Sequence, residues 1–389
     1  MYTILCVYPT PFNPQVGGVE RVTDLLAKKF IQCGYKILYL HHVHNELLMD
    51  YDFPATVYFF PCSDYHSHEN VVFYHNFLRE HNVDIIINQC GLFEDSELYL
   101  NIGNNKCKTI SVLHNSPMLN YEHLASEELV LKDNSFIGLL KLFARFCLYP
   151  RIKRSYLRSR RKHYDFLFPN SDKVCLLSES YIAEFEMYYK SYDRYKVVAI
   201  PNPCSFEPKQ CEKKKKLLYV GRLDKGQKRP DRLLRIWKKL YKKFPDWEMV
   251  IVGDGKEKDR LEKQAKKMDR IFFVGFQAPE QYYRDASIFC MTSNFEGFPM
   301  VLPEAMAFAT IPFSFDSFSA VHDIIEDGRT GVFVKPFSIK EYANKLASLM
   351  SDEERRIQYS NNCLTDVTRF RIETIVELWE DLFKELIVD

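Results

Sequence analysis

The chain has 389 residues, which is long for one core and comfortable for two domains of ordinary size. Its 53 Lys and Arg residues nearly balance 52 Asp and Glu residues, so the overall charge gives no reason to expect a nucleic-acid partner. Eleven scattered cysteines without a CxxC pair argue against a zinc site or a disulfide framework and favour reduced thiols in the cytosol. The first segment lacks signal-peptide features, and no apolar run reaches the roughly 18 residues of a membrane span.

Along the chain, short runs rich in Val, Ile and aromatic residues alternate with longer helical patterns, which predicts parallel sheets covered on both faces. The strands expected in the first half are residues 2–9, 36–43, 83–91, 108–115, 165–171 and 196–202. The strands expected in the second half are residues 216–222, 247–255, 270–276, 286–293, 310–315 and 331–336.

These two series predict an α/β protein with two Rossmann-like domains in tandem. The N-terminal domain is expected over residues 1–200 and the C-terminal domain over residues 217–370. The polar, proline-bearing stretch 201–216 between them is expected to be a linker. Residues 371–389 form an amphipathic pattern that predicts a C-terminal helix, packing back toward the N-terminal domain.

Sheets of this kind bind ligands at the carboxyl ends of their strands, so motifs that directly follow a strand carry most weight. In the first domain, Gly17 and Gly18 precede a helix, where backbone amides can approach a phosphate closely. His114 ends the fourth expected strand, where it can donate to a sugar hydroxyl or a developing charge. The two glycines are also explained by a flexible turn, and His114 is also explained as a surface or packing residue.

In the second domain, the loop after the first strand holds Arg222 and Lys228 around Gly226. Two cations and a helix N-terminus there can converge on a diphosphate, although most of the basic residues of the chain are solvated. Farther on, Glu296 is expected in the loop after a strand and Glu304 early in the following helix. Eight positions apart, the two acids suit the two ends of one elongated ligand better than a glycosidase pair. Glu304 near a helix N-terminus is also explained by structure alone.

The segment "EGFPMVLPEAMA" resembles the E-x7-E element of retaining glycosyltransferases of the GT-B fold, in the large family numbered four. Further fragments of that family follow in the expected order, namely "GGVER", "LHNSP", "IPNP", "VGRLDKGQK", "VGDG", "FVGF" and "EDGRTGVFV". The resemblance therefore spans nearly the whole chain. It implies a GT-B architecture in which two Rossmann-like domains face each other across a cleft.

Carried over by position, the resemblance implies that Glu304 holds the ribose of a nucleotide sugar and that Glu296 reaches the transferred sugar. Arg222 and Lys228 then balance the leaving diphosphate, and His114 binds the donor sugar near the reacting carbon. The other implied donor contacts are largely main-chain groups, those of Gly17, Gly18, Val274, Gly275, Gly297, Phe298, Pro299 and Met300.

The resemblance also implies transfer with retention by a front-face route, in which the diphosphate accepts the acceptor's proton and no metal or other cofactor is needed. The "DYD" of residues 50–52 is like a metal-binding DxD only superficially, because it lies far from the donor motifs. The chain departs from the family after the E-x7-E helix, where it reads "FATIPFSF" and has Asp323 in place of a common Glu.

Residues 141–162 carry nine basic residues and no acid, beside apolar Leu139, Leu142, Phe143 and Phe146. Such a segment is attracted to anionic lipid, and the alternative is a solvated helix packed on the domain. The cations expected at the membrane are Lys141, Arg145, Arg151, Lys153, Arg154, Arg158, Arg160, Arg161 and Lys162. We therefore expect a cytoplasmic protein at the inner face of the cell membrane, with a glycan or lipid-linked glycan acceptor.

Two other functional classes fit the same residues. A GT-B-like sugar-nucleotide epimerase shares the fold and nucleotide site but isomerises the donor, and a non-catalytic binding protein holds UDP without releasing it from its sugar. An NAD-dependent dehydrogenase fits poorly, because no GxGxxG follows either opening strand.

Overall fold

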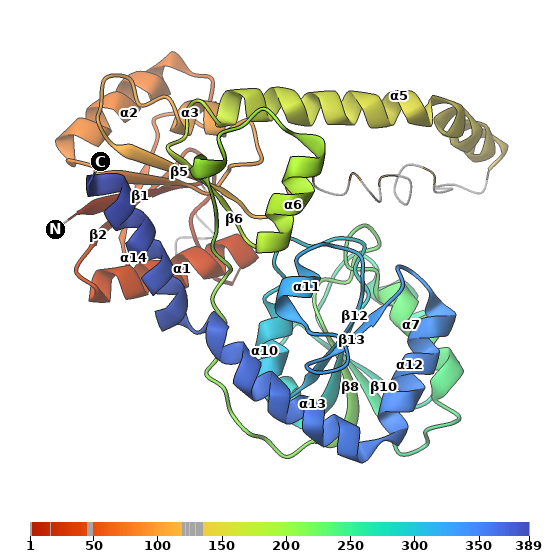
Figure 1. The fold of residues 1–389 in the computed structure, drawn as a ribbon. Helices are drawn as coiled ribbons and strands as arrows, with labels where there is room; N and C mark the ends of the chain where they lie inside the picture. The colour runs from red at the N-terminus through yellow and green to blue at the C-terminus, as the bar shows by residue number, and fades with distance from the viewer. Residues whose placement is uncertain are drawn as a thin grey trace. The chain divides into compact units, whose positions relative to one another are not determined.

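The computed structural model describes residues 2–15, 17–44, 50–118, 121, 124, 129 and 135–388. The chain divides into two compact α/β units, and each is described here by itself (Figure 1). Unit 1 comprises Met1–Tyr121, Phe143–Pro203 and Ile372–Asp389, and unit 2 comprises Glu122–Leu142 and Cys204–Arg371.

Unit 1 is built on a parallel seven-stranded sheet in the order β3-β2-β1-β4-β5-β6-β7. Its strands are β1 Thr3–Val7, β2 Lys36–His41, β3 Thr56–Phe59, β4 Ile85–Asn88, β5 Lys108–Leu113, β6 Lys173–Leu176 and β7 Val197–Ala199. The central strands β1 and β4 are buried along their whole length, as their continuous apolar runs require.

The strand expected at residues 165–171 is wrong, and β3 and β6 were not expected. Residues up to Leu167 belong to a long helix, in which Tyr164 and Leu167 are both fully buried at the three-residue spacing of one helix face. A short apolar run fits a buried strand and a buried helix equally well, so the pattern alone did not distinguish them.

The helices of unit 1 are α1 Gly18–Gln32, α2 His68–Glu80, α3 Ser96–Tyr99, α5 Phe136–Leu167 from Phe143 onward, α6 Glu179–Tyr188, η3 Arg194–Lys196 and α14 Ile372–Val388. The C-terminal helix α14 lies beside α1, as Figure 1 shows. The ring of Phe383 packs edge-on against Phe30 with 5.3 Å between ring centroids, and Trp379 packs on the same phenylalanine. Aromatic burial thus joins the end of the chain to the first helix.

Unit 2 is built on a parallel six-stranded sheet in the order β10-β9-β8-β11-β12-β13. Its strands are β8 Lys214–Val220, β9 Glu248–Val252, β10 Ile271–Gly275, β11 Ala286–Met291, β12 Ile311–Phe315 and β13 Val332–Val334. Strand β8 begins inside the stretch 201–216 that was expected to be linker. Its first three residues are lysines, which precede the apolar run and lengthen the strand at its amino end.

The helices of unit 2 are α7 Pro230–Leu240, α8 Lys258–Ala265, α9 Glu280–Asp285, α10 Val301–Ala307, α11 Val321–Ile324, α12 Ile339–Ser351, α13 Glu353–Asp366 and η4 Val367–Phe370. Alternate side chains of β8 and β9 pack with α7, α8 and α12 in the main core of this unit. The six-residue α9 lies on the opposite face of this sheet, where it contacts β8 and β11.

Helix α5 is the longest helix, with 32 residues and Pro150 in its interior. Its N-terminal part exposes large apolar side chains, namely Ile137, Leu139, Leu140, Phe143, Phe146 and Leu148. Within the described part of the chain, no helix combines the length and apolarity that crossing a membrane requires.

Candidate functional site

In unit 2, the loops after β8 and β11 meet at one edge of the sheet, because these two parallel strands are neighbours. The first loop carries Arg222 and Lys228, and the second carries Glu296. Main-chain and side-chain bonds join the loops, since Asn294 N donates to Gln227 O at 2.7 Å and Thr292 Oγ1 donates to Arg229 O at 2.9 Å. Three of the residues predicted to bind the donor are therefore brought together.

The carboxylate of Glu296 is buried, and Lys228 pairs with it. Lys228 Nζ lies 2.7 Å from Oε1 and 2.8 Å from Oε2 of Glu296, so it donates to both oxygens. Only 5% of the Glu296 side chain and 21% of the Lys228 side chain are exposed. The sequence predicted each residue at the site but not this pair. Because part of the Lys228 side chain remains exposed, its ammonium group can pair with Glu296 and also meet a second anion from the solvent side.

Arg222 is the exposed cation of the cluster, with 72% of its side chain accessible. Its terminal nitrogen donates to Gln227 Oε1 at 3.0 Å, while its Nε lies 3.8 Å from a carboxylate oxygen of Asp224. Asp224 Oδ1 in turn accepts from the backbone amides of Gln227 at 2.7 Å and Lys228 at 3.2 Å, which fixes the turn of the loop.

Two glycines of "VGDG" let the loop after β9 press directly on the Arg222 loop. A Cβ at Gly253 would lie 1.9 Å from Gly221 O, and one at Gly255 would lie 2.6 Å from Leu223 O. The close approach is held by the bond from Leu223 N to Asp254 O at 2.8 Å. Larger residues at either glycine would therefore displace the loop that carries Arg222.

Glu304 lies in the first turn of α10, as predicted, but its side chain is fully buried. Its Oε2 accepts a hydrogen bond at 3.0 Å from the hydroxyl of Tyr283, which is also fully buried on α9. A ligand can reach Glu304 only if the surrounding side chains move. The sequence did not single out Tyr283, whose neighbour in the chain, Tyr282, is also a tyrosine.

The segment 297–300 between the two acids is buried throughout. Phe298 packs edge-on against Phe370 with 5.4 Å between ring centroids, so its side chain belongs to the core of unit 2. The sequence analysis expected main-chain groups of this segment to meet the donor, and the packing of Phe298 leaves that expectation untested.

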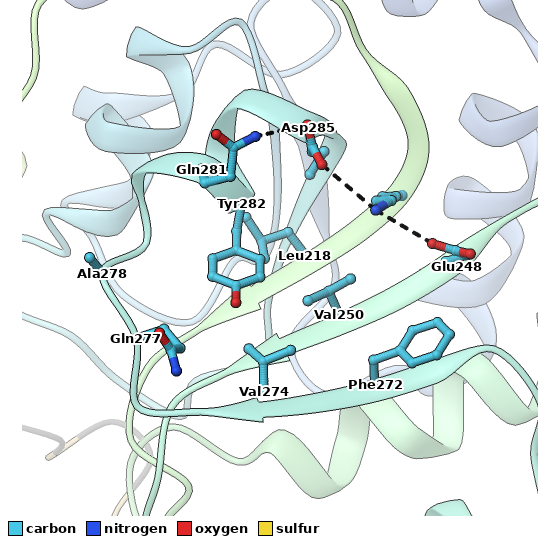
Figure 2. Close-up of a pocket in the computed structure, with 12 residues that line it drawn as sticks. Leu218, Glu248, Val250, Phe272, Val274, Gln277, Ala278, Gln281, Tyr282 and Asp285 are labelled. Carbon is cyan, nitrogen blue, oxygen red and sulfur yellow. Dashed lines mark hydrogen bonds and ion pairs between the residues drawn. The ribbon is translucent and has the colours of Figure 1, made fainter.

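Val274 and Gly275 end the edge strand β10, and Gly275 O accepts from Gly253 N at 2.8 Å. The Val274 side chain lines a cavity of about 550 Å³ on the sheet face beside α9, shown in Figure 2. Leu218, Val250 and Phe272 form one row across three paired strands at its floor. Figure 2 shows the ring of Tyr282, from α9, directed over the same space.

One end of this cavity is charged. Lys216 Nζ lies 3.6 Å from a carboxylate oxygen of Glu248 and 3.7 Å from one of Asp285, which also accepts from Lys214 Nζ at 3.0 Å. The positive charges of the two lysines offset the negative charges of the two acids. The cavity thus has an apolar floor at the strands and a neutral polar cluster at their amino ends.

In unit 1, Gly17 is the N-cap of α1 and Gly18 its first residue, at the carboxyl side of β1. The buried Glu20 reaches back to this N-terminus, and a Cβ on Gly17 would lie 2.5 Å from its Oε2. Burial raises the pKa of Glu20 above its ordinary value. The chain's own carboxyl group thus already occupies the helix end that was expected to meet a phosphate.

His114 follows β5 in the same unit, and its Nε2 is hydrogen-bonded to Oε1 of Gln89, which follows the neighbouring strand β4. Burial lowers the pKa of His114 to about 4, so the ring is neutral at pH 7. As a donor to Gln89, Nε2 carries the proton and Nδ1 is left as an acceptor. The sequence predicted the histidine but not the glutamine that orients it.

Three of the nine cations expected at a membrane have partners in unit 1. Arg160 donates to Leu92 O, Arg161 donates to Tyr188 O, both at 3.1 Å, and Lys153 lies over the ring of Tyr121. The other six make no hydrogen bond or ion pair with described residues, and they are Lys141, Arg145, Arg151, Arg154, Arg158 and Lys162.

The chain is similar in sequence and in fold to known glycosyltransferases. Residues 205–364 match the model of the family described as "Glycosyl transferases group 1". An uncharacterized glycosyltransferase of Haemophilus influenzae is 32% identical over 54% of this chain and 61% of its own length, so the chain spans about three fifths of that relative.

Two further matches extend over nearly the whole chain. A Campylobacter jejuni N-acetylgalactosaminyltransferase, named for a diphospho-undecaprenol substrate, is 26% identical over 91% of this chain and 92% of its own. The crystal structure of HepE from Anabaena in complex with UDP superposes with a TM-score of 0.74 at 16% identity, covering 99% of this chain and 100% of that one. The chain therefore has the GT-B fold of two Rossmann-like domains, and its residues 205–364 carry the similarity to the glycosyl transferases group 1.

Proposed function

We propose that the chain is a retaining, metal-independent glycosyltransferase. It moves a sugar from a UDP-sugar to a glycan or lipid-linked glycan acceptor in cell-surface polysaccharide synthesis. The observation that carries the proposal is the joined cluster of Arg222, Lys228 and Glu296 at the carboxyl ends of β8 and β11. It lies inside the stretch that matches the glycosyltransferase family.

In this proposal the diphosphate of the donor lies against Arg222 and Lys228, and the sugar lies against Glu296. The two cations stabilise the charge that grows on the diphosphate as the glycosidic bond breaks, and such preorganised electrostatics is usually the largest catalytic contribution. Backbone groups of residues 297–300 assist, and those of Gly17 and Gly18 join them once the Glu20 carboxyl group leaves the N-terminus of α1. Two buried polar atoms beside the cluster, Ser293 Oγ and Asn294 Oδ1, lack a partner among the described residues, which supports a polar ligand there.

The nucleoside end of the donor is assigned to Glu304, Val274 and Gly275. Glu304 accepts hydrogen bonds from the ribose, and the other two border the base through their main chain. Because Glu304 is closed off by its neighbours, binding requires α9 or α10 to shift, and the bond from Tyr283 is the contact to be exchanged. UDP is preferred as the nucleotide because HepE, a structural neighbour, was crystallised with UDP.

His114 is assigned to the sugar near the reacting carbon. Its ring is neutral at pH 7, so it acts there as a hydrogen-bonding group and not as a cation. The acceptor's proton passes to the leaving diphosphate, and the sugar–phosphate bond breaks as the new glycosidic bond forms on the same face. This route needs no protein nucleophile and no metal.

The acceptor is assigned to a membrane surface. The N-terminal part of α5 exposes Phe143 and Phe146 at 68% and 67%, and the six cations without described partners lie along the same helix, before and after these rings. Apolar insertion together with basic contacts is how peripheral helices bind anionic lipid. A relative that is named for a diphospho-undecaprenol substrate supports a lipid-linked acceptor. We accordingly place the protein at the inner face of the cell membrane.

The test begins with a thermal-shift screen of nucleotide sugars, followed by calorimetry with UDP on two variants. Glu304→Ala should lose roughly ten-fold to a hundred-fold in UDP affinity, since hydrogen bonds to a charged group are worth about 1.5 to 3 kcal/mol. Glu296→Ala should bind UDP nearly as the wild type does, because UDP carries no sugar.

Equal loss of UDP affinity in both variants would refute the assignment of one acid to each end of the donor. Product analysis then separates the remaining classes. Transfer or donor hydrolysis supports the proposal, an isomerised donor indicates an epimerase, and binding without any release of UDP indicates a non-catalytic protein.

A further inference from the structure

Gln227 lies at the centre of the donor cluster, between Arg222 and Lys228 in the loop after β8. Both ends of its amide are used. Its Oε1 accepts from the Arg222 guanidinium at 3.0 Å, and its Nε2 donates to Glu296 Oε2 at 3.1 Å and to Phe295 O at 3.3 Å. One neutral side chain thus connects the exposed cation of one loop to the buried acid of the other.

The main chain fixes where this amide can reach. Gln227 N donates to Asp224 Oδ1 at 2.7 Å, and Gln227 O accepts from Asn294 N at 2.7 Å. The residue is therefore anchored to its own loop on one side and to the loop after β11 on the other. Its side chain extends from a fixed point toward Glu296.

The chemistry of an amide is specific to this place. It offers an acceptor to a cation and a donor to an anion, whereas a carboxylate would repel Glu296 and an aliphatic side chain would serve neither partner. If the amide is lost, the Glu296 carboxylate still accepts hydrogen bonds from Lys228. Among the described residues, the Arg222 side chain then has only a carboxylate oxygen of Asp224 nearby, at 3.8 Å, which is beyond hydrogen-bonding distance.

We infer that Gln227 is a positioning residue for the donor cluster, holding the Arg222 guanidinium at a set distance and direction from the Glu296 carboxylate. The inference rests on the proposed function, since it assumes that Arg222 meets the leaving diphosphate and Glu296 the sugar. An exposed arginine without this contact samples many rotamers, and fixing it on each turnover lowers the rate. The effect belongs mainly to kcat, because the diphosphate gains charge in the transition state.

The first test replaces the amide by a side chain of similar length without polar ends. Gln227→Met should lower kcat/KM for the nucleotide sugar by about ten-fold to a hundred-fold, with most of the loss in kcat. The matched control is Gln264→Met on the exposed side of α8, which should match the wild type. If Gln227→Met and Gln264→Met have the same kcat as an active wild type, Gln227 does not position the cluster.

The second test uses pH to restore the lost function. The charged groups around position 227 are Arg222, Lys228 and Asp224 on its own loop and Glu296 on the loop after β11. In Gln227→Glu the introduced carboxyl lies beside the Glu296 carboxylate, which raises its pKa, and beside the cations Arg222 and Lys228, which lower it. Once protonated, it donates to Glu296 and accepts from Arg222, as the amide does.

The ratio of kcat/KM for Gln227→Glu to that of the wild type should therefore rise as the pH falls from about 8 to about 4, through the pKa of the introduced carboxyl. A ratio that stays flat over this range would overturn the inference, because a purely structural defect does not follow protonation of this group. A wild type that neither binds nor turns over any nucleotide sugar would instead refute the proposed function, and the two failures are thereby distinguished.

Discussion

At the scale of single residues, the two cations of the cluster differ in what they do for the folded state. Lys228 holds a buried carboxylate, whereas Arg222 is mostly exposed and contacts an uncharged amide. We expect Lys228→Ala to lower the free energy of unfolding by about 1 to 3 kcal/mol, since it leaves the charge of Glu296 poorly balanced. Arg222→Ala should change that free energy by less than about 0.5 kcal/mol.

Both variants should nevertheless lose kcat with the nucleotide sugar, because both cations are assigned to the diphosphate. Chemical denaturation and steady-state kinetics on the same preparations measure the two effects. Equal stability of the two variants would contradict the role of Lys228 as partner of a buried acid.

The buried histidines of unit 1 predict how stability depends on pH. His41 is fully buried, and burial lowers its pKa to about 3 from the ordinary 6.5. Between these two values the unfolded chain binds a proton that the folded chain excludes, so the free energy of unfolding rises with pH and levels off above about 6.5. His114, with a pKa near 4, acts in the same direction.

Replacing His41 by a residue that does not titrate should remove its contribution to the pH dependence of the free energy of unfolding. His41→Asn should reduce the slope of unfolding free energy against pH by about 1.4 kcal/mol per pH unit between about pH 4 and 6. Denaturation series at several pH values measure this slope for both proteins. Parallel curves for the variant and the wild type would show that His41 is not excluded from protonation in the folded state.

At the scale of elements, helix α5 carries basic residues that bind unit 1 and basic residues that have no partner among the described residues. Arg160 and Arg161 donate to backbone carbonyls of unit 1, so they hold the helix on its own domain. Replacing Arg151, Arg154, Arg158 and Lys162 by Gln leaves those bonds intact. This variant should lose sedimentation with liposomes that contain anionic lipid, and less so at high salt, where the wild type is itself weakened by screening.

The matched control removes four exposed lysines elsewhere, Lys256, Lys263, Lys266 and Lys267, from the loop and helix α8 region of unit 2. The two variants carry the same change in net charge, so only a membrane site on α5 distinguishes them. If both sediment alike, α5 is a solvated helix, as the alternative interpretation of the basic run held.

At the scale of the whole molecule, the proposed chemistry predicts how activity responds to removal of metal ions. Arg222 and Lys228 supply the positive charge that a divalent cation supplies in metal-dependent transferases, so activity should persist in EDTA with less than about a two-fold change. The measurement is turnover of the nucleotide sugar before and after chelation. Complete loss that manganese restores would direct attention to Asp50 and Asp52, in the "DYD" stretch.

Much of the architecture could be predicted from local pattern. The alternation of apolar runs and helices predicted two parallel sheets, because strands buried on both faces must be continuously apolar, as β1 and β4 are. The prediction failed at residues 165–171, because the first three of them end helix α5 and no strand forms there. It also missed β3, a strand of only four residues at the edge of the sheet, none of them fully buried.

The sequence by itself determined the fold class and the loops that carry the candidate site, since both follow from periodicity and from motifs at strand ends. Only the tertiary structure decided the pairing of Lys228 with Glu296, the bridge through Gln227 and the enclosure of Glu304 behind Tyr283. These contacts join residues 21 to 69 positions apart in the chain. The first two arise because parallel strands bring distant loops to one edge, and the third joins helices α9 and α10. No local pattern encodes which of these side chains meet.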